Sequence, residues 1–378
     1  MDATLELTQA LIRRPSVTPA DEGCQALIAE RLNRVGFLTE TLQYDNVTNL
    51  WARHGDQAPL LVFLGHTDVV PTGPVSQWQS DPFEPSIKGE RLYGRGAADM
   101  KGSVAAMVTA CERFVASTPA HAGSVAVMLT SDEEGPAING VAKVMAELGR
   151  RGTRIDACVV GEPSSVETLG DMVKIGRRGS LGGRLLVKGV QGHVAYPHRC
   201  DNPVHRFAPA LAELVDTRWD NGNEHFPPTS FQISNITAGT GATNVVPGEL
   251  DLLFNFRYST ELDETAIKTR MADMLERHGF KFVIDWNEGG ALPFLTQPGG
   301  LVDHVCDAVK VATGQIPVCS TEGGTSDGRF VAPTGAEVVE LGPTNGSIHQ
   351  IDENVGVAEL ASLSLIYEDV MRRVLKAR

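Results

Sequence analysis

The first half of the chain alternates short, continuously apolar runs with longer stretches of helical periodicity. LLVFLGHTDVV (60–70), SVAVMLTSDEE (124–134) and IDACVVGEP (155–163) are typical of strands, whereas KGSVAAMVTACERFVAS (101–117) and INGVAKVMAELGRRG (138–152) are typical of helices. Strands that are apolar on both faces and separated by helices are characteristic of a layered sheet. The pattern therefore predicts an α/β domain with a mixed, largely parallel sheet flanked by helices.

A different pattern interrupts this domain between about residues 176 and 290. We expect strands and helices in the order βαββαβ, at 180–190, 202–216, 230–238, 249–258, 264–279 and 280–287. This order is the ferredoxin-like signature. Helical patterns at 301–313 and 354–376 then resume the first domain, and a chain of 378 residues exceeds what one hydrophobic core usually holds. We predict a first domain formed by 1–175 and 291–378, with 176–290 inserted.

Charge and cysteine usage restrict the classes of partner. The formal net charge of −14 repels nucleic acid and anionic membrane surfaces, so an anionic substrate would need a local basic cluster. Acidic residues precede the first apolar residues and an Arg pair follows them, the reverse of a secretory signal peptide, and no apolar run approaches the roughly 20 residues of a membrane span. The six cysteines form no CxxC pair, which favours reduced, mostly buried thiols. We expect a cytoplasmic protein without nucleic-acid or membrane partners.

Histidine and acidic residues recur at the ends of the predicted strands. His66 and Asp68 lie two residues apart, hence on one face of a strand, where imidazole can bind a metal while the carboxylate orients it. Asp99 stands in the Gly-flanked segment GRGAADMKG and is suited either to bridging two cations or to capping the following helix. A strand-end histidine with an acidic turn residue is the alternative interpretation of the HTD segment.

Three further segments complete this set. TSDEEG offers Asp132, Glu133 and Glu134 at the end of a predicted strand. Adjacent strand residues point to opposite faces, so one carboxylate can bind a metal while its neighbour faces a reacting water. Glu162 follows an apolar strand, and His349 stands near the C-terminus. Each residue alone is as well explained by a solvated or capping role. Together they indicate an open site with nitrogen and oxygen ligands for two metals.

The motifs HTDVVPTG, GRGAADMKG, TSDEEG, GEPS, EGGTSDGRF and GPTNGSIHQIDE resemble those of the dinuclear zinc aminoacylase and carboxypeptidase family of metallopeptidases. They cover nearly the whole chain in the family's order. The resemblance implies a zinc-peptidase-like catalytic domain with an inserted lid and dimerisation domain. It also implies two Zn²⁺ per subunit, for which Co²⁺ can substitute. His66 and Glu162 would bind one ion, Glu134 and His349 the other, and Asp99 would bridge them.

The same resemblance implies catalytic roles for three residues. Asp68 would orient His66, and Glu133 would be the general base. His193 in VQGHVAYP matches a histidine that the lid of the other subunit of a homodimer brings to the active site. Lid closure would use hinges near Gly176 and Gly289–Gly290.

Substrate recognition is expected to depend on arginines, because guanidinium groups bind carboxylates in a bidentate fork. The resemblance, together with the need for a basic cluster in an acidic protein, favours Arg178 and Arg257 for this role, while Lys174 and Arg177 are assigned to a solvated face. The expected neutral partners, together with these two arginines, make up the substrate-binding set Arg178, Ser180, Asn244, Arg257, Gly324, Thr325 and Asn345. The glycine-rich segments lack the spacing of a phosphate-binding loop.

The resemblance, above all of the EGGTSDGRF and ELGPTNGSIHQIDE segments, implies hydrolysis of the amide of an N-acylated, carboxylate-bearing amino acid. N-succinyl-L,L-diaminopimelate, an intermediate of lysine biosynthesis, is the leading substrate that it implies. Two alternatives use the same metals: a deacylase of the acetylornithine type and a metallo-carboxypeptidase. A third alternative, from a different class, is a noncatalytic metal-binding dimerisation protein. The intact set of candidate ligands and base argues against it.

Overall fold

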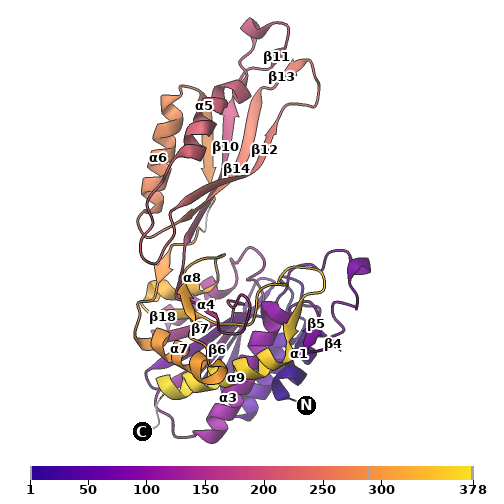
Figure 1. Cartoon of the computed structure of the whole chain (residues 1–378), viewed down its shortest axis with the longest axis vertical. Coiled ribbons are helices and arrows are strands. Elements are labelled where there is room, and N and C mark those ends of the chain that lie inside the picture. The colour runs from indigo at the N-terminus through magenta and orange to yellow at the C-terminus, as the bar shows by residue number, and fades with distance from the viewer. Residues whose placement is uncertain (1, 288–289, 376–378) are drawn as a thin grey trace. The chain divides into compact units, whose positions relative to one another are not determined.

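A computed structural model describes residues 2–287 and 290–375 (Figure 1). The chain divides into two compact units. Unit 1 comprises Met1–Gly176, Leu295–Ser320 and Ser326–Arg378, and unit 2 comprises Arg177–Phe294 and Thr321–Thr325. β9 (Gly176–Arg177) and β16 (Phe294–Leu295) lie where the chain passes from one unit to the other. Gly289, half of one expected hinge, lies outside the described residues.

Unit 1 contains an eight-stranded mixed sheet in the order β1-β2-β6-β3-β7-β18-β8-β17. β6, β3, β7 and β18 run parallel to one another in the centre, whereas β1 and β2 form an antiparallel hairpin that joins the sheet at β6. This arrangement confirms the predicted mixed, largely parallel sheet. The strands are β1 (Leu38–Tyr44), β2 (Val47–His54), β3 (Leu60–His66), β6 (Ser124–Thr130), β7 (Ala157–Val160), β8 (Met172–Lys174), β17 (Val318–Ser320) and β18 (Glu337–Glu340).

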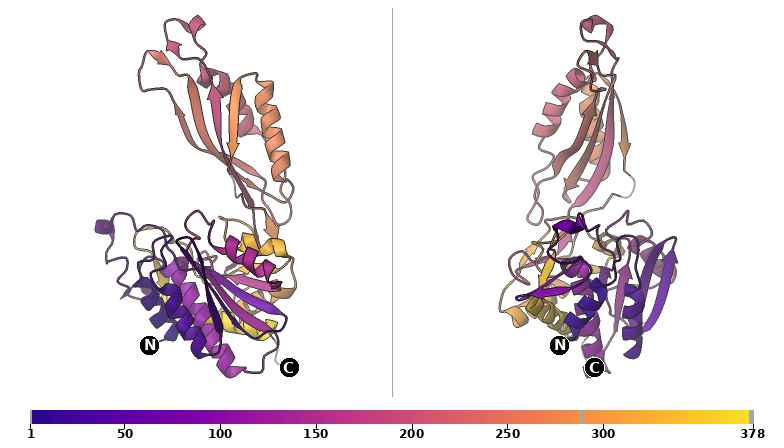
Figure 2. Two further views of the ribbon diagram at one scale, coloured as in Figure 1. Left: turned by 180° about the vertical axis from the view of Figure 1, so that it is seen from behind. Right: turned by 90° about the vertical axis from the view of Figure 1, so that its right-hand side faces the viewer.

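Helices cover both faces of this sheet (Figures 1 and 2). α3 (Gly102–Ser117) packs against α1 (Ala3–Ile12) and α9 (Val357–Val374), and α7 (Gly300–Thr313) packs against α9. Residues Gly102–Cys111 of α3 are all buried, because small and aliphatic side chains allow close packing around this part of the helix. The remaining helices of this unit are α2 (Cys24–Arg34), which packs against α3, and α4 (Val141–Arg150) and α8 (Gly328–Val331), which contact each other.

A small three-stranded sheet formed by β4 (Ser86–Lys88), β5 (Arg91–Tyr93) and β19 (Asn354–Gly356) lies beside these helices. β19 occupies the start of the segment expected to be one long helix, so α9 begins only at Val357. The expected end of that helix, residue 376, lies outside the described residues. Among residues 2–287 and 290–375, every helix is too short or too polar to cross a lipid bilayer.

Unit 2 has the predicted ferredoxin-like order: β10 (Gly179–Lys188), α5 (Pro203–Asp216), β12 (Ser230–Ala238), β14 (Glu249–Tyr258), α6 (Glu264–Arg277) and β15 (Lys281–Trp286). These strands form an antiparallel sheet in the order β12-β14-β10-β15. Burial alternates along β14, because one face of the sheet packs against α5 and α6. Aromatic side chains, including Phe207, Phe254 and Phe256, fill the core between the sheet and the helices.

Two local features of unit 2 lie at opposite ends of β10. β11 (Gly192–His193) and β13 (Val245–Val246) form a short ladder at one end of the four-stranded sheet (Figure 1). At the opposite end of β10, Gly179 packs under the ring of Tyr258, where an added Cβ would lie 2.2 Å from the ring carbon Cζ. Glycine is therefore required at this position, where β10 pairs with β14.

Candidate metal centre

The central parallel strands of unit 1 end at one edge of the sheet, and the candidate ligands begin there. His66 is the last residue of β3, Glu133 and Glu134 follow β6, and Glu162 follows β7. β6, β3 and β7 are adjacent in the sheet. Ligand sites in such sheets lie outside the carboxyl ends of the strands. Three segments far apart in the sequence thus converge because parallel neighbours end together.

Asp99 reaches the same place from an irregular segment that precedes α3. Its φ of −121° and ψ of 95° are non-helical, within the wide turn Ala97–Lys101. The carboxylate does not cap α3, whose N-cap residue is Lys101. Instead, Oδ1 lies 3.2 Å from Nε2 of His66, and Oδ2 lies 3.3 Å from Nε2 of His349. The two oxygens of one carboxylate therefore face two different histidines.

A second carboxylate accompanies each histidine. Glu162 Oε1 lies 3.6 Å from Nε2 of His66, and Glu134 Oε1 lies 3.0 Å from Nε2 of His349. The ligand atoms of His66, Asp99 and Glu134 all lie within 4.8 Å of one another, as do those of His66, Glu133 and Glu162. The arrangement is two histidine–carboxylate pairs with Asp99 between them.

Asp68 is a neighbour of His66, but its carboxylate has other partners. Nδ1 of His66 faces the backbone oxygen of Asp68 at 2.9 Å, and the nearest carboxylate oxygen of Asp68 lies at 3.6 Å. The Asp68 carboxylate accepts the backbone N–H groups of Glu133 at 3.4 Å and Glu134 at 3.1 Å. The main chain of Asp68 thus orients the imidazole, while its side chain fixes the turn that carries both glutamates.

That turn also corrects one expectation. The predicted strand over 124–134 ends at Thr130, so Glu133 and Glu134 are not strand residues on opposite faces. Their directions are set by the backbone hydrogen bonds to Asp68, a contact between segments that no period-2 pattern contains.

The cluster contains more acidic than basic side chains, and most of them are shielded from solvent. Burial raises the pKa of Glu133 well above its usual value, and the nearby charge of Asp327 raises it further. Burial also raises the pKa of Glu162, reinforced by the charges of Asp99 and Glu133. Hydrogen bonds to Asp99 and Glu134 raise the pKa of His349 to about 10. Buried carboxylates of this density need cations as partners.

The donor set fits divalent metal ions of the zinc type. Imidazole nitrogen and carboxylate oxygen are ligands that Zn²⁺ accepts, and there are more carboxylates than one ion requires. The described residues of this cluster include no cysteine, which distinguishes it from a closed structural zinc site. The six cysteines lie elsewhere: Cys24, Cys111 and Cys158 are buried, whereas Cys200, Cys306 and Cys319 are at least partly exposed, contrary to the expectation of mostly buried thiols.

Two acidic residues of this centre were not singled out from the sequence. Asp327 is 3% exposed and, among the described residues, neither of its carboxylate oxygens has a hydrogen-bond partner. Burial raises its pKa to about 7. Glu353 is 1% exposed and accepts the backbone N–H of Asp99 at 3.0 Å. The available sequence signals were the position of Asp327 inside the glycine-rich segment GGTSDG and that of Glu353 in the segment IDEN.

Three of the expected substrate-binding residues lie at the start of β10 in unit 2. Ser180 and Arg257 are directly opposite each other in the β10–β14 ladder, and Arg178 immediately precedes β10. The Nε of Arg178 is buried and has no hydrogen-bond partner among the described residues. Asn255, which was not expected here, donates a hydrogen bond to Oγ of Ser180 at 3.2 Å. Gly324 and Thr325 belong to the same unit.

His193 and Asn244 lie at the other end of β10, on the short β11–β13 ladder. His193 pairs with Val245, and the backbone oxygen of Asn244 accepts the N–H of Val194 at 3.1 Å. The imidazole of His193 is exposed, and its Nδ1 accepts the N–H of Ala195 at 3.1 Å. A ten-residue strand spans about 33 Å, so within unit 2 these two residues are remote from Ser180 and Arg257.

The remaining expected residues lie in unit 1 or at its boundary. Asn345 is held by its backbone N–H, which donates to the oxygen of Ser165 at 2.9 Å. The expected solvated positions of Lys174 and Arg177 were wrong, because both side chains are buried. Lys174 lies within β8, with Nζ 3.5 Å from Oγ of Ser320, and Arg177 donates to the backbone oxygen of Glu322 at 3.0 Å.

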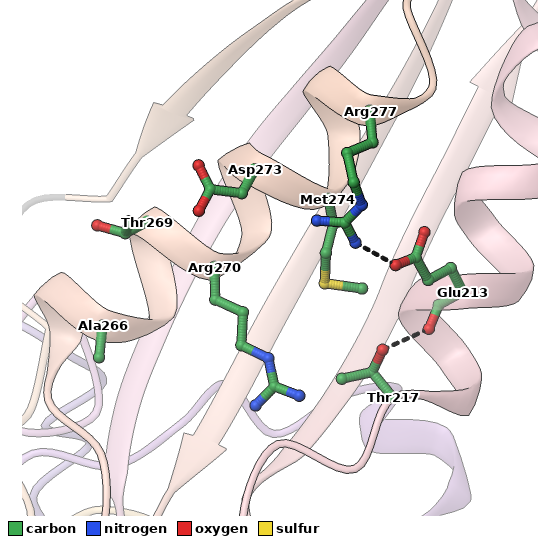
Figure 3. A pocket seen from close by; sticks show the side chains of 8 residues that line it. All are labelled: Glu213, Thr217, Ala266, Thr269, Arg270, Asp273, Met274 and Arg277. Carbon is green, nitrogen blue, oxygen red and sulfur yellow. Dashed lines mark hydrogen bonds and ion pairs between the residues drawn. The ribbon is translucent and has the colours of Figure 1, made fainter.

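A separate hollow of about 430 Å³ lies between α5 and α6 (Figure 3). Its arginines are already engaged: Arg277 pairs with Glu213, and Arg270 donates to the backbone oxygens of Arg218 and Trp219. A ligand would have to displace these contacts, so the metal centre of unit 1 remains the candidate for chemistry.

Comparisons with known proteins agree with this geometry. The model of Peptidase family M20/M25/M40 matches residues 62–373. Over 375 residues the chain is 60% identical to a protein of Alkalilimnicola ehrlichii called succinyl-diaminopimelate desuccinylase, covering 99% of this chain and 100% of that one. A protein of Methylococcus capsulatus with the same name is also 60% identical over 375 residues, covering 99% of both chains.

A solved structure shows the same fold at low sequence identity. The M20 family metallo-carboxypeptidase Sso-CP2 from Sulfolobus solfataricus matches with a TM-score of 0.83 and 18% identity, covering 98% of this chain and 99% of that one. The family match, the named relatives and the cluster of candidate ligands are those of a metal-dependent hydrolase. The chain belongs to the M20/M25/M40 peptidase family, which confirms the resemblance noted in its motifs.

Proposed function

We propose that this chain is a metal-dependent amide hydrolase that cleaves N-succinyl-L,L-2,6-diaminopimelate to succinate and L,L-2,6-diaminopimelate, in bacterial lysine and diaminopimelate biosynthesis. The observation that carries the hydrolytic chemistry is the Asp99 carboxylate, whose two oxygens face His66 and His349 beside the partly buried Glu133. The choice of substrate is supported by the relatives that are 60% identical over nearly the whole chain.

The ligand assignment follows the two histidine–carboxylate pairs. His66 and Glu162 would hold one ion, His349 and Glu134 the other, and Asp99 would contact both. We propose zinc as the metal, with cobalt able to substitute. When bound, two such ions polarise the amide carbonyl, acidify a water molecule and stabilise the oxyanion that develops.

Glu133 is the proposed general base. A carboxylate oxygen of Glu133 accepts a proton from the attacking water and delivers it to the departing amine nitrogen. Burial and the charge of Asp327 raise the pKa of Glu133, and a higher pKa makes its carboxylate a stronger base. The Asp68 carboxylate, by accepting the N–H of Glu133, holds the base at the turn after β6.

The substrate carries three carboxylates, and the proposed partners for them are cationic or neutral donors. Arg178 and Arg257 would bind carboxylates through charge-assisted hydrogen bonds. Arg178 supports this role because its buried Nε lacks a partner among the described residues. The proposed neutral partners are Ser180, Gly324, Thr325, Asn345 and Asn244. Asn244 lies beside the β11–β13 ladder with His193, so it would be presented together with His193 from the other subunit.

We also propose that the protein acts in the cytoplasm as a homodimer, in which unit 2 serves as lid and dimerisation domain and His193 is presented to the active site of the other subunit. Exposure of the imidazole at the tip of unit 2 supports this role. Mixing two inactive variants tests it, Glu133→Gln and His193→Ala. If His193 acts in trans, one of the two sites in each mixed dimer has an intact base and receives an intact histidine, so activity returns. A fully active monomer, or a mixture that stays inactive although mixed dimers form, would refute the proposal.

The substrate assignment is tested by comparing hydrolysis of N-succinyl-L,L-diaminopimelate and N-acetylornithine by zinc-loaded enzyme, with a chelator-treated control. We expect selective cleavage of the succinyl compound that is abolished by the chelator and restored by zinc. Preference for the acetyl compound would move the chain to the deacylases that act on acetylornithine. Cleavage of neither compound would overturn the specificity.

A further inference from the structure

A buried ion pair, Arg95 with Glu353, lies beside the segment that carries Asp99. Arg95 and Glu353 are each 1% exposed, and Nη1 of Arg95 lies 2.7 Å from Oε2 of Glu353. A buried ion pair is weak evidence for stability alone, because desolvation offsets much of the attraction. The hydrogen bonds that Arg95 and Glu353 make to the surrounding backbone therefore indicate the role of the pair.

Glu353 is surrounded by backbone donors of the segment that ends at Asp99. Its Oε1 accepts the N–H groups of Ala98 and Asp99, each at 3.0 Å, and its Oε2 accepts the N–H of Gly96 at 3.0 Å. The backbone at Asp99 is non-helical, so this segment does not satisfy its N–H groups as a regular helix does. The carboxylate of Glu353 takes the place of those missing acceptors.

Arg95 extends the same network to two of the other ligand-bearing segments, those of His66 and His349. Its Nη1 donates to the backbone oxygen of Gln350 at 3.1 Å, next to His349, and its Nη2 donates to that of Pro71 at 3.3 Å, three residues after Asp68. The guanidinium also lies 5.1 Å from the ring centroid of Trp78. One pair of side chains thus connects the segments that carry His66, Asp99 and His349.

We propose that Glu353 and Arg95 are positioning residues that hold the Asp99 carboxylate between His66 and His349. This inference rests on the proposed function, because it takes Asp99 as the ligand shared by two metal ions. We assign neither residue as a metal ligand or as a contact of the substrate. Loss of the network lets the Asp99 segment turn and separates the three ligand segments, so it weakens metal binding before it unfolds unit 1.

The test compares Glu353→Gln with a matched control, Glu368→Gln. Glu368 also forms an ion pair at 2.7 Å within unit 1, with Arg113 between α3 and α9, away from the strand ends. Glutamine keeps the size of Glu353 but turns an amide N–H₂ toward backbone donors. Zinc affinity is measured by competition with a chromophoric chelator, and the absorption spectrum of the cobalt-loaded protein reports ligand geometry.

We expect Glu353→Gln to bind zinc about 10–100-fold more weakly than wild type. Its cobalt spectrum should be altered and its circular dichroism unchanged, and Glu368→Gln should match wild type in all three. Wild-type affinity and spectrum in Glu353→Gln would overturn the inference while leaving the proposed function intact. A wild-type protein that binds no zinc would overturn both. If Glu353→Gln does not fold, Arg95→Lys decides on the same readouts, because lysine keeps the charge but cannot reach all three oxygens.

An independent observation concerns two thiols at the far edge of the same unit. Sγ of Cys306 in α7 lies 3.9 Å from Sγ of Cys319 in the edge strand β17. Cys319 is exposed and Cys306 partly exposed. The hydrogen bond between the thiols lowers the pKa of Cys319 to about 7, whereas it raises the pKa of Cys306. Thiolate character and access are what thiol–disulfide exchange requires.

We infer that Cys306 and Cys319 form a reversible disulfide with a small oxidised disulfide such as glutathione disulfide as oxidant. The Cys319 thiolate attacks one sulfur of glutathione disulfide and releases one glutathione thiolate. The Cys306 thiolate then attacks Cys319 of the mixed disulfide and releases the second. Two protein thiols are oxidised, one disulfide is reduced, and β17 becomes tied to α7.

Incubation of the full chain with glutathione disulfide, followed by intact mass and peptide mapping, tests this assignment. We expect the wild type to lose two hydrogen atoms and yield a Cys306–Cys319 cross-linked peptide that dithiothreitol reverses. Cys306→Ser should stop at one glutathione attached to Cys319, and Cys200→Ser should behave as wild type. A wild type that stops at the mixed disulfide, or does not react, would refute the inference.

Discussion

Oδ2 of Asp99 lies 3.3 Å from Nε2 of His349, although Asp99 precedes α3 and His349 follows β18, far along the chain. The backbone of His349 has a φ of 59°, in the left-handed region that residues other than glycine seldom adopt. Such a conformation persists where the surroundings determine it, and it is frequent at functional sites. It directs the imidazole between two carboxylates, those of Asp99 and Glu134.

Metal binding should release the proton that His349 carries. The pKa of His349 is raised to about 10 in the metal-free protein, so its imidazole is protonated at pH 7, and a metal can bind only its neutral form. Apparent zinc affinity should therefore rise with pH across the neutral range and level off near the pKa of His349. Calorimetry in two buffers of different ionisation enthalpy counts the protons. His349→Asn should release fewer, and a heat of binding that is independent of the buffer would contradict the prediction.

Glu133 and Glu134 are adjacent in the chain but should respond differently to the same substitution. Glu133→Gln should lower kcat about 10²–10⁴-fold, because general-base catalysis is lost, while zinc content stays at the wild-type level. Glu134→Gln should instead lower zinc content, because its carboxylate pairs with His349. Metal analysis after gel filtration, together with initial rates, separates the two effects. Equal turnover in Glu133→Gln and wild type would remove Glu133 as the base.

The parts of the site that could be predicted from the sequence are those encoded by strand ends. His66 and Glu162 follow apolar runs whose parallel pairing is itself predictable, so their convergence follows from the sheet. Asp327 and Glu353 are different, because their environment depends on burial and on distant partners. Lys174 and Arg177 were wrongly predicted to be solvent-exposed, because burial of their side chains also depends on distant partners. A basic cluster in a sequence does not reveal that its side chains lie inside a sheet or against a loop.

Arg178 should contribute to substrate binding rather than to the chemical step. Arg178→Met removes a charge-assisted hydrogen bond and should raise KM for the succinyl substrate roughly 10–100-fold, with a smaller effect on kcat and none on zinc content. Arg154→Met is the control, because the Arg154 side chain is 85% exposed and forms only a loose ion pair, 3.4 Å from Asp156. Steady-state kinetics check both variants. An unchanged KM in Arg178→Met would exclude Arg178 from the binding site.

The stability of unit 1 should depend on the strand that delivers His66. Phe63 lies in β3, is fully buried and packs with its ring centroid 5.2 Å from that of Tyr367 in α9. Phe63→Ala removes this contact and leaves a cavity, so it should cost about 3–5 kcal/mol in the free energy of unfolding of unit 1. Leu38→Ala, at a position that is 81% exposed, should change it by less than about 0.5 kcal/mol.

Urea unfolding of the metal-free protein followed by tryptophan fluorescence measures both, since Trp51 belongs to β2 of the same sheet. Unit 2 has its own core around Phe256, so its transition should not move with either substitution. Equal losses in the two variants would mean that the β3–α9 contact does not limit the stability of unit 1.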